Sequence, residues 1–170
     1  RRAILSMYKV ATLYKFSKIL DPFKIHNSIR TKLKSLAVCG TILVGKEGIN
    51  GTISAYSKNS IDNAIKFISK FDGFNNLDVK YSTSKKKPFV RLKVKLKKEI
   101  VTIGDTTIDP TKVVGEYVNP ADWNELIDNK DTILIDTRNN YENSIGTFKK
   151  SLNPKTSKFR EFPNWLKKQK

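Results

Sequence analysis

Within residues 89–98, positions 90–97 alternate strictly between apolar and cationic side chains, and this alternation constrains the fold more than any other feature of the sequence. The apolar set is Val90, Leu92, Val94 and Leu96, and the cationic set is Arg91, Lys93, Lys95 and Lys97. An extended strand separates two such sets completely, because its successive side chains point to opposite faces. The chain must therefore build a sheet with one open face. We expect Val90, Leu92 and Val94 to be buried against the helices, and Arg91, Lys93 and Lys95 to be exposed on the open face.

Segments with the period of a strand and segments with the period of a helix follow one another in an informative order. We predict strands over residues 7–16, 38–44, 52–55, 77–81 and 89–96, and helices over 22–36 and 60–71. Asp21 is a suitable N-cap for the first helix, Pro22 suits its first turn, and Phe23 and Ile29 are expected on its buried face. The order β-α-β-β-α-β plus one strand predicts an α+β, ferredoxin-like fold, with an antiparallel sheet and both helices on one face.

A glycine-rich turn separates the second and third predicted strands. Gly48, Asn50 and Gly51 all fall within it, and these residue types tolerate the positive φ angles that tight turns need. We interpret the three as structural residues of a hairpin.

The positive charge is concentrated in the first part of the chain. The net charge is +17, and residues 1–100 hold 22 Lys and Arg against 6 Asp and Glu, whereas residues 101–170 hold 11 against 10. This asymmetry indicates a polyanionic partner for the first part, most simply nucleic acid. The alternative is compositional bias, since 27 of the 33 cations are lysines.

A run of eight cations without a carboxylate surrounds the alternating segment. It consists of Lys85, Lys86, Lys87, Arg91, Lys93, Lys95, Lys97 and Lys98. Such a ladder can follow a phosphate backbone, so we predict that these residues bind RNA. The alternative is an edge strand that lysines protect against aggregation, although the lysine triplet exceeds what that protection requires.

A second unit is expected after a linker. Residues 101–116 have little periodicity and contain Gly104 and Gly115, and residues 117–170 begin a new pattern. Residues 132–135 are apolar and predict a buried strand of the parallel type. Asp136 and Arg138 follow directly, where functional residues often lie in open α/β sheets, although the carboxylate could equally cap the next turn or pair with Arg138.

Composition excludes several classes of protein. One cysteine and one histidine exclude an internal disulfide and the usual Cys/His metal sites, so no metal site is predicted. No apolar run approaches the roughly 20 residues that span a bilayer, and the start lacks the pattern of a signal peptide. We therefore expect a soluble, cytoplasmic protein with no membrane partner.

Several motifs resemble the family of rhodanese-related tRNA uridine hydroxylases, in order and over residues 7 to about 166. The motifs include Glu47-Gly48-Ile49-Asn50-Gly51-Thr52, Arg91-Leu92-Lys93-Val94-Lys95-Leu96, Asp136-Thr137-Arg138-Asn139, Ile145-Gly146-Thr147-Phe148 and Phe159-Arg160-Glu161-Phe162-Pro163. The resemblance implies an acylphosphatase-like, ferredoxin-like domain over 1–100, a linker over 101–116, and the start of an α/β rhodanese-like domain over 117–170. It also implies tRNA as the partner.

The reaction that the resemblance implies is the oxygen-dependent 5-hydroxylation of the wobble uridine in tRNA, with molecular oxygen as co-substrate and any cofactor unknown. The family's essential cysteine lies in a Cys-x-Gly-Gly-x-Arg-Cys loop, which we expect beyond Lys170. No residue is therefore assigned a catalytic role. Asp136 and Arg138 are interpreted as support on the rhodanese side, and Cys39 as a small buried apolar residue.

Three hypotheses remain open from the sequence. The first is the tRNA-binding part of the hydroxylase, which would be catalytically inert as this chain alone. The second is a fragment of a rhodanese-type sulfurtransferase, and the third is a noncatalytic RNA-binding module. We also expect residues 117–170 either to pack on the first domain or to self-associate, because an incomplete sheet leaves apolar surface to cover.

Overall fold

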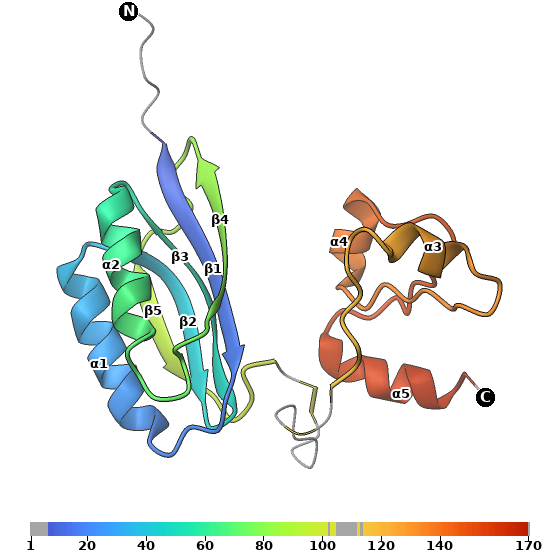
Figure 1. The fold of residues 1–170 in the computed structure, drawn as a ribbon, viewed down its shortest axis with the longest axis horizontal. Coiled ribbons are helices and arrows are strands. Elements are labelled where there is room, and N and C mark those ends of the chain that lie inside the picture. Colours follow the sequence, from blue (N-terminus) through green and yellow to red (C-terminus); the bar gives the residue numbers. More distant parts are fainter. Residues whose placement is uncertain (1–6, 102, 105–111, 113, 170) are drawn as a thin grey trace, which may run out of the picture. The chain divides into compact units, whose positions relative to one another are not determined.

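The computed structural model describes residues 7–101, 103–104, 112 and 114–169, which fall into two compact units. The first unit reaches Val101 and contains the sheet, and the second contains the short helices of the C-terminal part (Figure 1). The segment 1–6 and most of the predicted linker 101–116 lie outside the described residues. No helix in the described part of the chain has both the length and the apolar character needed to cross a bilayer.

The first unit is a five-stranded sheet with two helices on one of its faces (Figure 1). Its elements are β1 (Tyr8–Phe16), α1 (Pro22–Ser35), β2 (Cys39–Gly45), β3 (Gly48–Ala55), α2 (Lys58–Ile68), β4 (Asp78–Ser84) and β5 (Leu92–Leu96). The strand order is β4-β1-β3-β2-β5. The first four strands pair antiparallel, whereas β5 joins β2 in parallel. The α+β, ferredoxin-like fold is confirmed, and the fifth strand makes the sheet mixed and not purely antiparallel.

Helix α1 begins where the sequence predicts. The carboxylate of Asp21 accepts a hydrogen bond from the backbone N–H of Lys24 at 2.9 Å, and Pro22 stands in the first turn. Ile29 is fully buried. Phe23 was expected beside it and is 63% exposed, so that prediction is wrong. Six residues at about 100° each place Phe23 roughly 120° around the helix from Ile29, away from the sheet.

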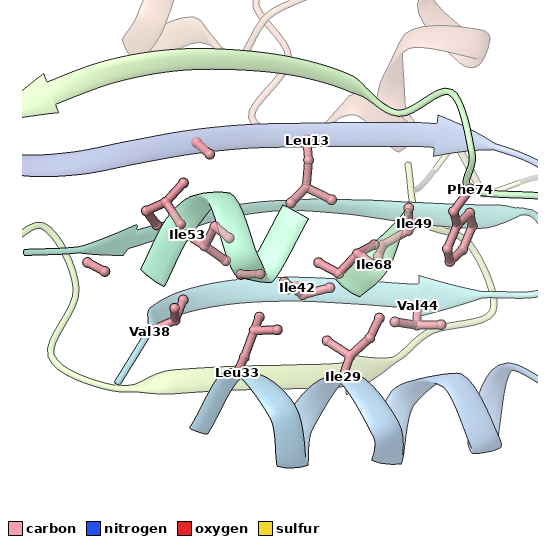
Figure 2. Close-up of a cluster of buried hydrophobic side chains, with 14 of the residues drawn as sticks. Leu13, Ile29, Leu33, Val38, Ile42, Val44, Ile49, Ile53, Ile68 and Phe74 are labelled. Atoms are coloured by element: carbon pink, nitrogen blue, oxygen red, sulfur yellow. The ribbon is translucent and has the colours of Figure 1, made fainter. Parts of the chain in front are cut away.

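The core lies between the helices and one face of the sheet (Figure 2). Alternate residues of the strands point into it, which gives a continuous apolar layer. The buried side chains include Leu13, Ile42, Val44, Ile49 and Ile53 from the strands, Ile29 and Leu33 from α1, and Ile61, Ala64 and Ile68 from α2. The remaining strand residues therefore point to the opposite, open face.

Strand β5 keeps the predicted alternation over a shorter length. Leu92 and Val94 are half-buried against the core, and Lys93 and Lys95 are exposed. Val90 was expected in the core and is 88% exposed, so that prediction is wrong. The reason is that β5 begins only at Leu92, so Val90 belongs to the connection that precedes it. Leu96, at the end of the strand, is 42% exposed.

The second unit contains only short elements, namely α3 (Trp123–Asp128), α4 (Asn140–Ile145), the 3-10 turn η1 (Phe159–Glu161) and α5 (Phe162–Lys167). The prediction of a buried strand over residues 132–135 is wrong. A single parallel bridge between Ile135 and Leu152 forms there, and Ile133 is 73% exposed. A parallel strand needs neighbours along its length and cover on both faces, and the described residues of this unit provide one bridge.

Hydrogen exchange should separate the two units. We expect the amides of residues 133–135 to exchange faster than those of residues 41–44, because β2 is paired on both sides whereas the apolar segment has one bridge. Amide exchange followed by NMR on the intact chain would measure this directly. Equal protection of the two segments would contradict the difference in packing.

Candidate nucleic-acid interface

The cation ladder follows β5 and the connection that leads into it. All eight side chains are exposed, and Lys85, Lys86 and Lys87 lie in the connection between β4 and β5. Pairing with β2 continues past both ends of the strand. The N–H of Gly40 donates to the carbonyl of Arg91 at 3.1 Å, and the N–H of Lys97 donates to that of Val44 at 2.9 Å. The ladder from Arg91 to Lys97 therefore spans roughly 20 Å of extended backbone.

The position of β5 bears on the alternative explanation of the ladder. The strand is at the edge of the sheet, beside β2, as protection against aggregation would require. However, Lys93 and Lys95 pair with Thr41 and Leu43, residues of the open face, so their side chains border a surface and not only an edge. The ladder is thus one margin of the open face.

The open face also brings together residues that the sequence analysis did not select. Thr12 lies opposite Thr52 on one side and Lys80 on the other, and Thr41 lies opposite Thr52 and Lys93. These five residues form one row across all five strands, which we call the threonine strip: Lys80, Thr12, Thr52, Thr41 and Lys93. No single segment of sequence could reveal this row, because the register of four strand pairings creates it.

The predicted glycine turn is shorter in the structure than in the sequence analysis. Gly45 pairs with Gly48, so the turn itself is Lys46 and Glu47, and Gly48, Asn50 and Gly51 all lie within β3. The turn region holds the backbone that follows β5. Glu47 Oε1 accepts from the N–H of Ile100 at 2.5 Å, and Asn50 Nδ2 donates to the carbonyl of the same residue at 3.3 Å. Asn50 therefore fastens the segment after β5 to the sheet.

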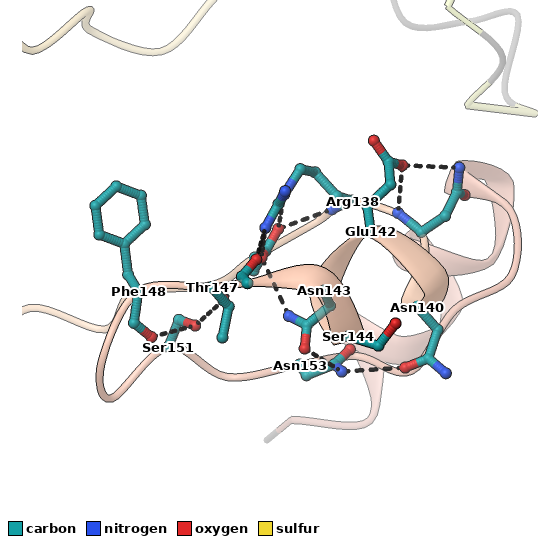
Figure 3. Close-up of polar contacts among 12 residues, drawn as sticks. Arg138, Asn140, Glu142, Asn143, Ser144, Thr147, Phe148, Ser151 and Asn153 are labelled. Carbon is teal, nitrogen blue, oxygen red and sulfur yellow. Dashed lines mark hydrogen bonds and ion pairs between the residues drawn. The ribbon is translucent and has the colours of Figure 1, made fainter.

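In the second unit, hydrogen bonds converge on the carboxylate of Asp136 from Arg138, Asn143 and Thr147, the three donors that Figure 3 labels. Arg138 donates to its carboxylate from Nε at 2.9 Å and from Nη2 at 2.6 Å, and its backbone N–H donates at 3.2 Å. Asn143 Nδ2 donates at 3.1 Å and Thr147 Oγ1 at 2.9 Å. Arg138 also donates to the carbonyl of Gly146 at 2.7 Å. The network ties the turn after the apolar segment to the middle and the C-terminal end of α4.

This network favours a structural role for Asp136. The hydrogen bonds from Arg138 hold the pKa of the Asp136 carboxyl well below its ordinary value, with help from Thr147, although burial acts in the opposite direction. A carboxylate engaged by five donors is a poor general base. A cavity of about 420 Å³ adjoins it, lined among others by Trp123, Phe148 and Ser151.

Few other side chains among the described residues could take part in a reaction or bind a metal. Cys39 was expected to be buried, and that expectation is wrong: it is half-buried on the open face, with Sγ 3.9 Å from the carbonyl oxygen of Val90. The reason is its register opposite Ser54, whereas the core-facing positions of β2 are Gly40, Ile42 and Val44. Within the described ranges, no three His, Cys, Asp or Glu residues gather closely enough to hold a metal ion.

Comparison with known proteins gives one family and several close relatives. Residues 8–100 match the family described as the UPF0176 acylphosphatase like domain. A tRNA uridine(34) hydroxylase of Acinetobacter baumannii (strain AYE) is 46% identical over 160 residues, which are 94% of this chain and 50% of that protein. A tRNA uridine(34) hydroxylase of Rhizobium leguminosarum bv. trifolii (strain WSM2304) is 48% identical over 162 residues, 95% of this chain and 52% of that protein.

A solved structure, the acylphosphatase from Bacillus subtilis, has a TM-score of 0.42 and 10% identity over 52% of this chain and 98% of that chain. The chain spans about half the length of the curated relatives it matches.

Proposed function

Because the chain belongs to the family of the UPF0176 acylphosphatase-like domain, we propose that it is the tRNA-binding part of a tRNA uridine(34) hydroxylase. The observation that carries the proposal is the cation ladder on an accessible sheet edge, in a unit with a net charge of +16 over residues 1–100. Exposed lysines and arginines at such spacing neutralise phosphates and release counterions, which is the main source of affinity for nucleic acid.

We assign RNA positioning, and not the hydroxylation step, to the described residues. The single cysteine, Cys39, is on the sheet of the first unit, where its Sγ lies 3.9 Å from the backbone carbonyl oxygen of Val90, a neutral group that does not activate a thiol. Asp136 and Arg138 support the fold of the second unit through their mutual ion pair at 2.6 Å. With tRNA as the partner, we place the protein in the cytoplasm.

Salt dependence tests this proposal. Replacing Lys93 and Lys95 with glutamine should lower the slope of log affinity for tRNA against log salt concentration by roughly two, because two phosphate contacts are lost. Fluorescence anisotropy with labelled tRNA at several salt concentrations would measure the slope. An unchanged slope would contradict phosphate binding by these two lysines and would favour the alternative, that they protect the edge strand against aggregation.

A matched control is available on the opposite layer of the same unit. Lys66 of α2 and Lys70, just after that helix, are exposed on the helical side of the sheet. Replacing this pair with glutamine removes the same charge and should leave the slope much closer to that of the unmodified chain. Equal effects of the two double variants would show that only total charge matters.

Two other functions stay open as proposals. A noncatalytic RNA-binding module would give the same salt dependence, and it differs in whether the full-length protein hydroxylates tRNA. Sulfur transfer is supported only by the rhodanese resemblance.

Self-association through residues 117–170 stays a prediction, supported by the exposure of Ile133, Ile145 and Phe148.

A further inference from the structure

The threonine strip is the most regular polar feature of the open face. Thr12, Thr41 and Thr52 come from three adjacent strands, and their neighbours in sequence, such as Leu13, Ile42 and Ile53, are fully buried on the other face. The three hydroxyl-bearing side chains therefore share one side of the sheet. Lys80 and Lys93 end the row on the two edge strands. With strands about 4.8 Å apart, the strip is roughly 19 Å long.

The strip is accessible to a ligand. Thr12, Lys80 and Lys93 are exposed, and Thr41 and Thr52 are half-buried. At the β5 end, Thr41 and Lys93 line a hollow of about 190 Å³ together with Phe89 and Arg91. Helices α1 and α2 cover the opposite face and do not compete for this surface (Figure 1).

The hydroxyl groups retain hydrogen-bonding capacity. Thr12 Oγ1 and Thr52 Oγ1 are 3.1 Å apart and share one hydrogen bond, in which either can be the donor. Each hydroxyl offers one donor and two acceptor sites, so the pair can still donate one hydrogen bond outward and accept others. A ribose 2′-hydroxyl is likewise both donor and acceptor, and it is the group that distinguishes RNA from DNA.

We propose that the threonine strip binds ribose 2′-hydroxyls of an unpaired RNA segment lying across the strands, with Lys80 and Lys93 binding phosphates near its ends. The inference rests on the proposed function and adds to it a means of selecting RNA over DNA. A single strand is the occupant because one narrow row of hydroxyls between two lysines matches one sugar–phosphate backbone. The cation ladder supplies affinity, and the strip supplies the discrimination.

Threonine also favours strands for reasons unrelated to binding, since its branched side chain packs well on a pleated surface. That explanation accounts for each threonine separately. It does not account for their common row, for lysines at both ends, or for the hollow beside Thr41. The two explanations differ in one measurable respect, which is the preference for RNA.

The test compares a single-stranded RNA oligonucleotide with its 2′-deoxy counterpart of the same bases. The unmodified chain should bind the RNA roughly tenfold more tightly, about the effect of one net hydrogen bond. Replacing Thr12, Thr41 and Thr52 with valine, which keeps their shape, should remove most of that preference while leaving the salt slope unchanged. As a control, Thr83→Val, at a position of β4 that alternates to the opposite side from Lys80, should keep the preference.

A probe with 2′-O-methyl groups tests the same idea on the unmodified protein, so the result does not depend on the stability of the triple variant. It should bind more weakly than the unmodified RNA, because the 2′ donor is lost and only the acceptor oxygen remains. Equal binding of RNA and DNA by the unmodified chain would overturn the role of the strip and leave the proposed tRNA binding standing. Failure to bind either probe or tRNA would overturn the proposed function itself.

Discussion

Replacing Gly48 with alanine should lower the free energy of unfolding of the first unit by at least about 3 kcal/mol, the largest effect that we expect from a single methyl group. Gly48 has φ of 138°, a conformation that L side chains rarely adopt. A Cβ there would also collide with the backbone carbonyl of Lys15, since β3 pairs with β1 at this point. Strain and collision add together, and neither the backbone of β1 nor that of β3 can move without breaking the sheet.

Chemical denaturation followed by circular dichroism would measure the change in the unfolding free energy. Gly115→Ala is the matched control, because Gly115 has no neighbouring atom within 4 Å of an added Cβ and lies outside the sheet. That variant should differ from the unmodified chain by no more than about 0.5 kcal/mol. If Gly48→Ala unfolds at the same denaturant concentration as the control, the described path of the hairpin is wrong.

Replacing Asp136 with alanine should destabilise the second unit by about 3 kcal/mol. The variant leaves the guanidinium of Arg138 without its carboxylate and removes the acceptor of Asn143 and Thr147. The amides of Asp136 and Leu152 report on this unit, because they donate to Leu152 and Leu134 across the single bridge. We expect both to lose protection from hydrogen exchange, whereas alanine in place of the exposed Asp131 should leave them protected.

Protonating Asp136 with acid should destabilise the second unit in the same way as replacing it. The pKa of Asp136 is depressed in the folded state, so its contribution to stability is present above the ordinary pKa of an aspartate, about 3.9, and is lost as the pH falls through the lower folded value. Protection of the Leu152 amide should therefore persist at pH 4 and decline only in stronger acid. A decline centred near pH 6 would contradict the assignment to this carboxylate.

Local features of the fold could be predicted because their causes are local. The N-cap of α1 depends on Asp21 and Pro22, and the exposure of Lys93 and Lys95 depends on strand alternation. The pairing of Asp136 with Arg138 was one of the alternatives left open, and they are within reach of one another because only Thr137 separates them in the chain. The wrong prediction for Phe23 also had a local cause. Phe23 is apolar, but its position in the helix does not lie on the buried face that contains Ile29.

The candidate site could be predicted only in part. The ladder was visible because its members are close in sequence. Thr12, Thr41 and Thr52 were missed because they are separated by up to 40 residues and are unremarkable in their own segments. Residues 132–135 show the converse: a strongly apolar segment predicts a strand, but without partners along its length it forms one bridge.

By itself, the sequence determined which segments alternate, where the first helix begins, and where the positive charge is concentrated, since each of these depends on neighbouring residues. The tertiary structure alone decided that β5 joins β2 in parallel, that Val90 is left outside the strand, and that three threonines and two lysines form one row. These outcomes depend on register, and register is set by which apolar side chains of distant segments fill the shared core, because a shift of one residue would turn every core side chain toward solvent.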